Sequence, residues 1–433
     1  MRVLACRSRI TVAVTCLFAI VLCVNARSEP KKPGASSGAT AAWPQFLGPD
    51  RNGISPETGL IAAWPKDGPP EVWRVAGGQG MSGLAISGGK LFTMVQKDGR
   101  QWLVCLDAQT GKSIWEQDVA PAYRNQMGDG PRGTPAVAGD LVYAFTGEGI
   151  LAALKTADGK IVWQKNLVSQ FGGKPADYGM AGSPLVVGKR VVVTVGASQA
   201  TVVAVEGATG EVAWKAGQDS PAGYSSPVVL RTADREFVAA FHGEGCLGLD
   251  PDTGAELWSY PYITDFGCNI ATPLAVDSGV FLSAGENHGS VLLALKANGN
   301  AFDVSETWAS QGPKSVMRNE WQTSILLEGF LYGFDNVGGA GPISHLACIN
   351  AKTGERQWQQ LRFGKGNMIA AEGKLIMTTI QGELVVAIAS PQKFEELGRK
   401  MVVGKTRTAP SLAGGMLYLR DEREIVCVDL RRK

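Results

Sequence analysis

Apolar and polar residues are arranged along this chain in a unit that recurs every 42 to 51 residues. Each unit has an apolar run, an Asp or a substitute, two further residues, Thr-Gly or a variant of it, and then a Trp. The copies end at Trp115, Trp163, Trp214, Trp258, Trp308 (a degenerate copy) and Trp358, and Trp73 has the last run without the preceding turn. Such regular spacing indicates an internal structural repeat.

A second marker precedes each copy, because an apolar run starts at or near a proline. The clearest starts are at Pro135, Pro184, Pro227 and Pro273, and weaker equivalents, one of them at Pro410, bring the number of starts to eight. Proline is tolerated at the first residue of a strand, where its missing N–H removes no ladder hydrogen bond. The Asp, Thr and Gly before each Trp favour a tight hairpin, since Gly adopts positive φ and Asp bonds the nearby backbone.

Each unit therefore predicts four antiparallel strands, the content of one propeller blade. The last unit stops before a Trp strand, whereas the segment around Trp73 is such a strand without its three partners. We predict that these two ends pair and close the ring. The predicted fold class is all-β, with residues 43–433 forming a single eight-bladed β-propeller of four-stranded antiparallel blades. In the seventh unit, which lacks the Trp, the fourth strand is expected at Lys400–Val403, after a helical turn around Phe394–Leu397.

The N-terminal residues predict export. Three arginines precede the apolar run Ile10–Val24, and the residues up to Ala26 suit cleavage by signal peptidase. The run is short for a membrane span, although an uncleaved or lipid-linked anchor at Cys23 stays an alternative. We expect a signal peptide over residues 1–26, a flexible leader over 27–42, and a mature chain in the periplasm or cell envelope without a transmembrane span.

Overall composition narrows the function classes. Lys and Arg number 42 against 40 Asp and Glu, a formal net charge of +2, which argues against a nucleic-acid binder held by bulk charge. The chain is 45% hydrophobic, enough for a large core, so global disorder is excluded. The 55 glycines are expected mainly in hairpin turns.

The cysteines and histidines are interpreted as structural. Cys105, Cys348 and Cys427 occupy one small-residue position of the repeat, and Cys246 lies two residues earlier. Equivalent positions on facing sheets are about 10 Å apart, which is too far for a disulfide, so we expect buried free thiols. Cys268 lies in a loop and no role follows for it. By the same spacing argument the three histidines do not converge, and no metal site is predicted.

The repeated motif resembles the tryptophan-docking motif of propellers of the pyrroloquinoline quinone (PQQ) type, over nearly all of the mature chain. The segments WPQFLGPDRNGISPETGL, GDGPRGTP and AGYSSP are similar to those of a broad group of exported bacterial PQQ-like repeat proteins. The resemblance implies a propeller whose docking tryptophans are the seven named above. It extends in fold to quinoprotein alcohol dehydrogenases and to the propeller subunit of the outer-membrane assembly machinery.

In a propeller, the connections from each outer strand to the next inner strand gather over the central channel, and loops carry function more often than packed strands. The candidate ligand-binding residues there are Arg132, Tyr178, Tyr224, Asn269, Arg318, Trp321 and Arg407. Arginine pairs bidentately with carboxylates and an aromatic face stacks on a ring, so these residues predict a pocket for a planar anion. Two alternatives stay open: the same side chains plug the channel mouth, or they form a protein-binding surface.

The leading hypothesis is a monomeric, non-catalytic binding or scaffold propeller with envelope proteins as partners, and no catalytic residue is assigned. The alternative is a PQQ-dependent alcohol or sugar dehydrogenase. Its calcium ligands or base would come from Asp129, Asp265 and Glu320, since calcium requires several converging oxygens. The resemblance to those dehydrogenases implies an adjacent Cys-Cys pair, which this chain lacks.

Overall fold

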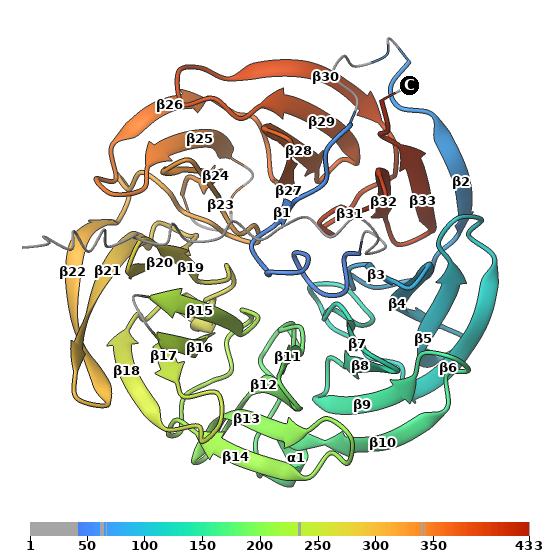
Figure 1. Ribbon diagram of the computed structural model, residues 1–433, viewed down its shortest axis with the longest axis horizontal. Helices are drawn as coiled ribbons and strands as arrows, with labels where there is room; N and C mark the ends of the chain where they lie inside the picture. The colour runs from blue at the N-terminus through green and yellow to red at the C-terminus, as the bar shows by residue number, and fades with distance from the viewer. Residues whose placement is uncertain are drawn as a thin grey trace, which may run out of the picture. The chain divides into compact units, whose positions relative to one another are not determined.

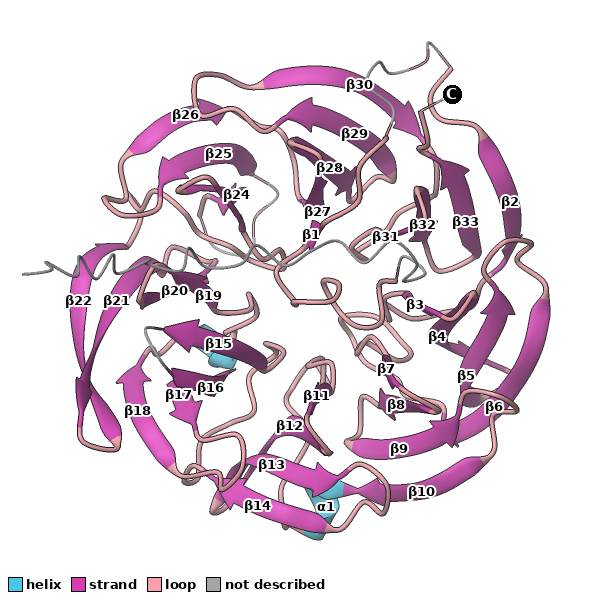
Figure 2. Ribbon diagram, viewed as in Figure 1, coloured by secondary structure: helices cyan, strands magenta, loops and turns pink. Residues whose placement is uncertain are grey.

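A computed structural model describes residues 42–60, 65, 67–232, 235–338, 341 and 343–432 (Figure 1). The expected signal peptide and all but the last residue of the expected leader lie outside the described residues. Regular structure is almost entirely strand, as Figure 2 shows. The helical elements are α1 (Leu167–Gln170) and the single turn η1 (Asp265–Gly267).

Within this described part of the chain the strands form eight sheets arranged around a centre, so the predicted eight-bladed propeller is confirmed. Blade 1 contains β3 (Ala85–Ser87), β4 (Lys90–Lys97), β5 (Arg100–Asp107) and β6 (Ser113–Pro121). Blade 2 contains β7 (Ala136–Ala138), β8 (Leu141–Phe145), β9 (Ile150–Lys155) and β10 (Ile161–Asn166). Blade 3 contains β11 (Leu185–Val187), β12 (Arg190–Ala197), β13 (Ala200–Glu206) and β14 (Val212–Ala216). Blade 4 contains β15 (Val228–Thr232), β16 (Arg235–His242), β17 (Gly245–Leu249) and β18 (Glu256–Pro261).

The second half of the ring repeats this plan. Blade 5 contains β19 (Leu274–Val276), β20 (Gly279–Ala284), β21 (Gly289–Asn298) and β22 (Ala301–Gln311). Blade 6 contains β23 (Ile325–Leu327), β24 (Phe330–Asn336), β25 (Ser344–Asn350) and β26 (Arg356–Gln360). Blade 7 contains β27 (Gly366–Ala371), β28 (Lys374–Thr379), β29 (Glu383–Ile388) and β30 (Glu395–Met401). Blade 8 contains β31 (Ser411–Ala413), β32 (Met416–Arg420), β33 (Glu424–Asp429) and β2 (Glu71–Ala76).

The ring closes between the two ends of the repeat region, as predicted. Strand β2 pairs antiparallel with β33, and Trp73 lies opposite Cys427. Apolar side chains fill the space between neighbouring blades, for example Phe92 and Leu103 of blade 1 against Val142 of blade 2. Because β2 pairs with β33, the third strand of blade 8 has a partner on its outer side, as it does in the other blades.

One strand was predicted at the wrong place. The fourth strand of blade 7 is β30, from Glu395 to Met401, and the expected helical turn around Phe394–Leu397 is absent from this described segment. Glu396 pairs with Ala387 and Gly398 with Val386 of β29. The charged sequence resembles a helix turn, but an outermost strand leaves much of its surface in solvent, where charged side chains are tolerated.

Tryptophan and glycine of the repeat meet each other between blades. The indole N–H of Trp73 donates to the Ala108 carbonyl of the next blade at 3.0 Å, and its ring covers Gly111. A Cβ at Gly111 would lie 2.8 Å from that ring, and Gly111 has φ +70°. The turn therefore requires glycine for two reasons, the close contact and the positive φ. The same indole hydrogen bond joins Trp115 to Thr156, Trp163 to Gly207, Trp214 to Pro251, Trp308 to Ala351 and Trp358 to Ser390.

Trp258 is the exception, and its neighbour explains why. Its indole N–H has no hydrogen-bond partner, and the ring instead lies against Gly248 of its own blade. The next blade is the degenerate copy, in which a long hairpin between β21 and β22 replaces the Thr-Gly turn. Six of the seven predicted docking tryptophans therefore bond to the following blade, and Trp258 contributes packing alone.

The segment before the blades, residues 43–60, starts in the middle of the ring and runs outward after β1 (Figure 1). Trp43 forms a β-bridge with Ile86 of β3, and strand β1 (Ile54–Ser55) pairs in parallel with β27. Glu57 then accepts hydrogen bonds from the backbone N–H groups of the turn between β31 and β32. This turn lies at the end of the blade opposite to the interblade connections, so the segment, here called the plug, closes the channel from that side.

Candidate functional site

A cavity lies at the centre of the ring, on the side of the interblade connections. It encloses about 1080 Å³, a figure that includes the space open to solvent. Each of the eight connections or the strand start that follows it contributes lining, and the plug supplies its base through Trp43, Phe46 and Leu47. Concave sites lined by aromatic side chains with a few polar groups are typical of ligand pockets.

Arg132 lines the cavity but also holds its own loop together. Its guanidinium donates to the carbonyls of Gly130 at 2.5 Å and Gly128 at 2.7 Å, and it lies 4.8 Å from the ring centre of Tyr123. The side chain is mostly buried, and burial lowers the pKa of Arg132 from its ordinary value. Arg132 is therefore a fixed positive charge in the wall, with part of its hydrogen-bonding capacity already used.

Arg407 and Trp321 meet at the cavity from two different connections. The Arg407 guanidinium lies 4.8 Å from the Trp321 ring centre, and the Lys365 ammonium lies 4.6 Å from it. One Arg407 nitrogen, Nη1, donates to the Met127 carbonyl at 2.8 Å. Asn367 donates to the Arg407 carbonyl, which fixes the backbone beneath this side chain. The result is a cation held beside an aromatic face at the cavity wall.

Two tyrosines form a flat part of the same wall. Tyr178 and Tyr224 are stacked with ring centres 5.6 Å apart and planes at 26°, and both line the cavity. The Tyr224 hydroxyl accepts a hydrogen bond from the Tyr178 backbone N–H at 3.4 Å. Burial raises the pKa of Tyr224 far above its ordinary value, so its hydroxyl is protonated at neutral pH.

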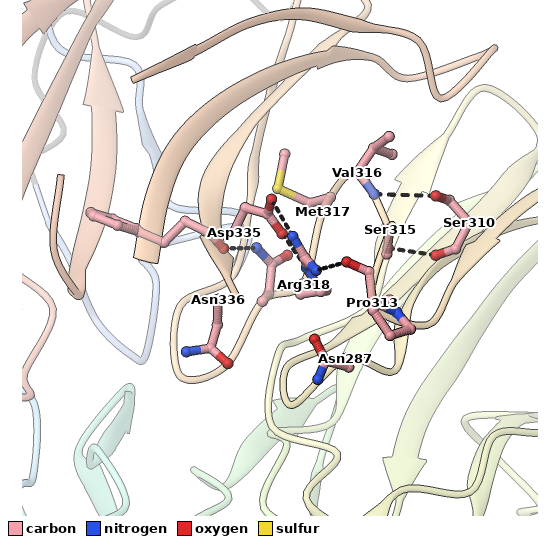
Figure 3. A network of polar contacts seen from close by, with 12 residues as sticks. Asn287, Ser310, Pro313, Ser315, Val316, Met317, Arg318, Asp335 and Asn336 are labelled. Atoms are coloured by element: carbon pink, nitrogen blue, oxygen red, sulfur yellow. Dashed lines mark hydrogen bonds and ion pairs between the residues drawn. The ribbon is translucent and has the colours of Figure 1, made fainter. Parts of the chain in front are cut away.

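Two of the predicted site residues lie away from the cavity. Arg318 is buried and forms a bidentate pair with Asp335 at 2.6 and 2.8 Å, and its third contact is the Pro313 carbonyl (Figure 3). Asn269 is fully buried, and its amide donates to the carbonyls of His242 and Tyr262. Both side chains hold connections in place, which agrees with the interpretation that polar groups there satisfy loop carbonyls.

The three candidate carboxylates do not converge. Asp129 accepts from the backbone of Asn125 within its own loop. Asp265 is exposed in η1, and Glu320 is paired with Lys365 at 2.6 Å. Among the described residues no group of three His, Cys, Asp or Glu side chains is placed to hold a metal ion. Residues 42–432, as far as described, therefore bring no cluster of three such side chains to the cavity.

The nucleophilic and basic groups near the mouth are not activated. Cys268 is half-buried, and burial raises the pKa of its thiol to about 12, so the reactive thiolate is scarce at neutral pH. Burial lowers the pKa of His242 to about 4 and keeps this imidazole neutral. The five described cysteines are free thiols, as predicted, and four of them are buried.

The structure brings five of the predicted site residues together around one cavity, and each lies in an interblade connection: Arg132, Tyr178, Tyr224, Trp321 and Arg407. Sequence reasoning missed the base of the cavity. The signal available was the apolar cluster Trp43-Pro44-Gln45-Phe46-Leu47, which precedes the first repeat and has no strand partner within it. The plug shows that such a cluster packs inside the ring.

Comparison with known proteins agrees with the geometry of the repeat. The model of the family described as outer membrane protein assembly factor BamB matches residues 57–127 and 99–327, which together span more than half of the chain. The chain belongs to this family. The match confirms the prediction, made from the repeated motif, that this chain is related to the PQQ-like propellers.

Individual relatives divide into two groups. The chain is 23% identical over 300 residues to outer membrane protein assembly factor BamB of Yersinia pestis, covering 66% of this chain and 71% of that protein. It is 31% identical over 120 residues to quinohemoprotein alcohol dehydrogenase ADH IIB of Pseudomonas putida, covering 26% of this chain and 17% of that enzyme.

Among solved structures, quinohemoprotein alcohol dehydrogenase from Comamonas testosteroni superposes with a TM-score of 0.66 and 16% identity, over 92% of this chain and 82% of the enzyme. At that identity the likeness concerns the fold alone. A separate finding bears on membrane association: the described residues contain no helix long and apolar enough to cross a bilayer.

Proposed function

We propose that this protein is an exported, non-catalytic binding propeller of the cell envelope, which presents its interblade connections to partner proteins. The observation that supports this most directly is that the candidate catalytic side chains do not come together at the cavity. Asp129, Asp265 and Glu320 contact separate local partners, and neither a cysteine nor a histidine of the described part of the chain lines the cavity. The relatives matched over the greater share of the chain are named as assembly factors rather than as enzymes.

Exposed apolar side chains on the connections favour a protein partner. Ile263 and Phe266, both between β18 and β19, are 72% and 69% exposed, and Leu361 after β26 is 65% exposed. Phe266 has φ +56°, a backbone conformation that a bulky residue rarely adopts. Large apolar and aromatic side chains held out in solvent are typical anchors of protein interfaces.

The dehydrogenase alternative was tested against the cavity. Its aromatic walls and arginines suit a planar anion, but the calcium that accompanies PQQ in those enzymes would find no converging carboxylates among the described residues. The residues present therefore do not fit PQQ together with calcium. We derive no catalytic step for this chain.

Partner capture with matched variants tests the proposal. Tagged residues 27–433 would be used to capture partner proteins from envelope extracts. The proteins captured by the unaltered chain would be compared with those captured by the double variant Ile263→Ser/Phe266→Ser. The control is Ile161→Ser/Val162→Ser, which removes two exposed apolar side chains from the outer strand β10 instead. We expect partner proteins that are lost in the first variant and kept in the control.

Two outcomes would contradict the proposal. One is recovery of no protein that depends on Ile263 and Phe266. The other is turnover, measured as dye reduction with alcohols or sugars after addition of PQQ and calcium to the purified protein, which would favour the enzyme.

A further inference from the structure

The two arginines of the cavity wall have no carboxylate partner. Among the described residues, neither Arg132 nor Arg407 forms an ion pair with Asp or Glu, whereas most other arginines with described side-chain contacts do. Asp129 lies near enough to Arg132, and Glu320 to Arg407, to act on them electrostatically, but these carboxylates bond to the Asn125 backbone N–H and to Lys365. Asp421 directs its oxygens to the backbone N–H groups of Gly404, Arg423 and Glu424. Neither cavity guanidinium is therefore hydrogen-bonded to a carboxylate among the described residues.

Arg407 also keeps unused donors. Its Nη1 bonds to the Met127 carbonyl and contacts the Met81 sulfur, but Nη2 and Nε have no hydrogen-bond partner among the described residues. A guanidinium presents five N–H donors in a planar fork that matches a carboxylate. The protein contacts leave the edge with Nη2 and Nε available to an incoming anion.

Around these charges the wall is flat and apolar. Trp321 lies beside Arg407, the stacked pair Tyr178 and Tyr224 forms another wall, and Trp43 and Leu47 of the plug form the base. Such surroundings lower the local dielectric constant, which strengthens a charge-assisted hydrogen bond to a bound anion. An apolar ligand body would bury its surface against the rings while its charged end reached the arginines.

We propose that the central cavity binds an organic carboxylate with a flat apolar body, held by Arg407 and Arg132 and packed against Trp321 and the Tyr178–Tyr224 pair. Binding is reversible and needs no metal ion, because the guanidinium groups supply the charge. The carboxylate can belong to a free small molecule or to the C-terminal residue of a peptide, since both present the same chemistry. This site is independent of the Ile263 and Phe266 surface, so either proposal can fail without the other.

Isothermal titration calorimetry of the full mature chain tests the site with 2-naphthoate and with its neutral analogue 2-naphthalenemethanol. We expect 2-naphthoate to bind and the alcohol to bind at least about tenfold more weakly, because it cannot pair with a guanidinium. This comparison uses unaltered protein, so it decides the question even if a variant does not fold. A short peptide ending in phenylalanine, with a free or an amidated carboxyl end, forms the second arm.

Two variants locate the binding. Arg407→Gln removes the proposed charge, and Arg124→Gln removes one from an exposed position on the connection that also carries Arg132. We expect Arg407→Gln to weaken 2-naphthoate at least about tenfold and Arg124→Gln to leave it unchanged. Binding of 2-naphthoate alone identifies a small-molecule site, and binding of the free-acid peptide identifies a chain terminus.

Three results would overturn the proposal. The first is the absence of binding by both 2-naphthoate and the free-acid peptide. The second is equal affinity for the acid and the alcohol, and the third is equal affinity in the unaltered chain and a folded Arg407→Gln variant.

Discussion

Arg318 and Arg407 both lie on interblade connections, the first between blades 5 and 6 and the second between blades 7 and 8, yet their surroundings differ. Arg318 is buried, and Asp335 neutralises it through two hydrogen bonds (Figure 3). Arg407 is half-buried, faces the cavity, and has a carbonyl and an indole ring as neighbours instead of a carboxylate. One arginine is a structural ion pair, and the other is a charge open to a ligand.

The difference comes from the strand behind each connection. Asp335 lies in β24, where its side chain is fully buried and also accepts from Gln359 at 3.2 Å. Asp421 follows β32 at the position that corresponds to Asp335, but its carboxylate accepts from the backbone N–H groups of Gly404, Arg423 and Glu424. Asn367 and Met127 supply neutral contacts to Arg407 instead. A charged residue in a loop therefore indicates a binding site only when no carboxylate of the neighbouring strand is directed at it.

Removing the buried pair's cation should have the largest effect. Arg318→Met leaves Asp335 charged and buried, and the expected loss in the free energy of unfolding is about 3–5 kcal/mol. Urea denaturation followed by circular dichroism measures it. Arg318→Met/Asp335→Leu is the matched control and should recover most of the loss, since no buried charge then lacks a partner. A single-variant loss below about 1 kcal/mol would contradict the structural role.

His242 is a second buried ionisable side chain, and unlike arginine it can release its proton. It forms no ion pair among the described residues, and its folded pKa of about 4 lies below the ordinary value near 6.5. The unfolded chain therefore binds the proton more tightly between these values, so stability is lost as pH falls from about 6.5 to about 4. The loss is at most about 3 kcal/mol.

Urea midpoints across that pH range, compared between the unaltered chain and His242→Gln, isolate this contribution. Acidic groups titrate alike in both proteins, and only the unaltered chain should show the extra dependence. Parallel curves for the two proteins would show that His242 keeps its ordinary pKa.

The smallest expected effect on stability belongs to Arg407. Arg407→Gln removes one hydrogen bond to a carbonyl at a half-buried position, so the free energy of unfolding should change by about 1 kcal/mol or less. Thermal unfolding by calorimetry provides the measurement. A loss as large as that of Arg318→Met would assign Arg407 to the framework and remove the contrast between the two arginines.

The same contrast describes what can be predicted from sequence. The blades were predictable because the Trp73–Gly111 contact joins residues at fixed positions of successive repeats, so its spacing is visible along the chain. The degenerate turn after Trp258 was visible too, although the loss of its indole hydrogen bond was not. Strand β30 was misplaced because an outer strand carries no apolar alternation strong enough to set its bounds.

The site was predictable in location and less so in membership. Tyr178, Tyr224 and Trp321 lie on connections that converge, and convergence follows from the repeat. Whether Arg318 or Arg407 faces the cavity depends on side-chain direction and on a partner in another strand, neither of which spacing reveals. The plug escaped prediction because its partners, such as Ala370 beside Ile54, are distant in sequence.

The plug has a consequence for the order in which this protein is completed during synthesis. Residues 43–60 leave the ribosome before any of the blades, but Ile54 pairs with Ala370 and Glu57 with the turn at Gly414 and Gly415, which emerge more than 300 residues later. Trp73 likewise pairs with Cys427, which is synthesised much later than Trp73. A nascent chain interrupted before residue 427 therefore exposes an unpaired strand, an apolar plug and an unfinished cavity together. Closure of the ring and completion of the cavity base thus take place together, late in synthesis.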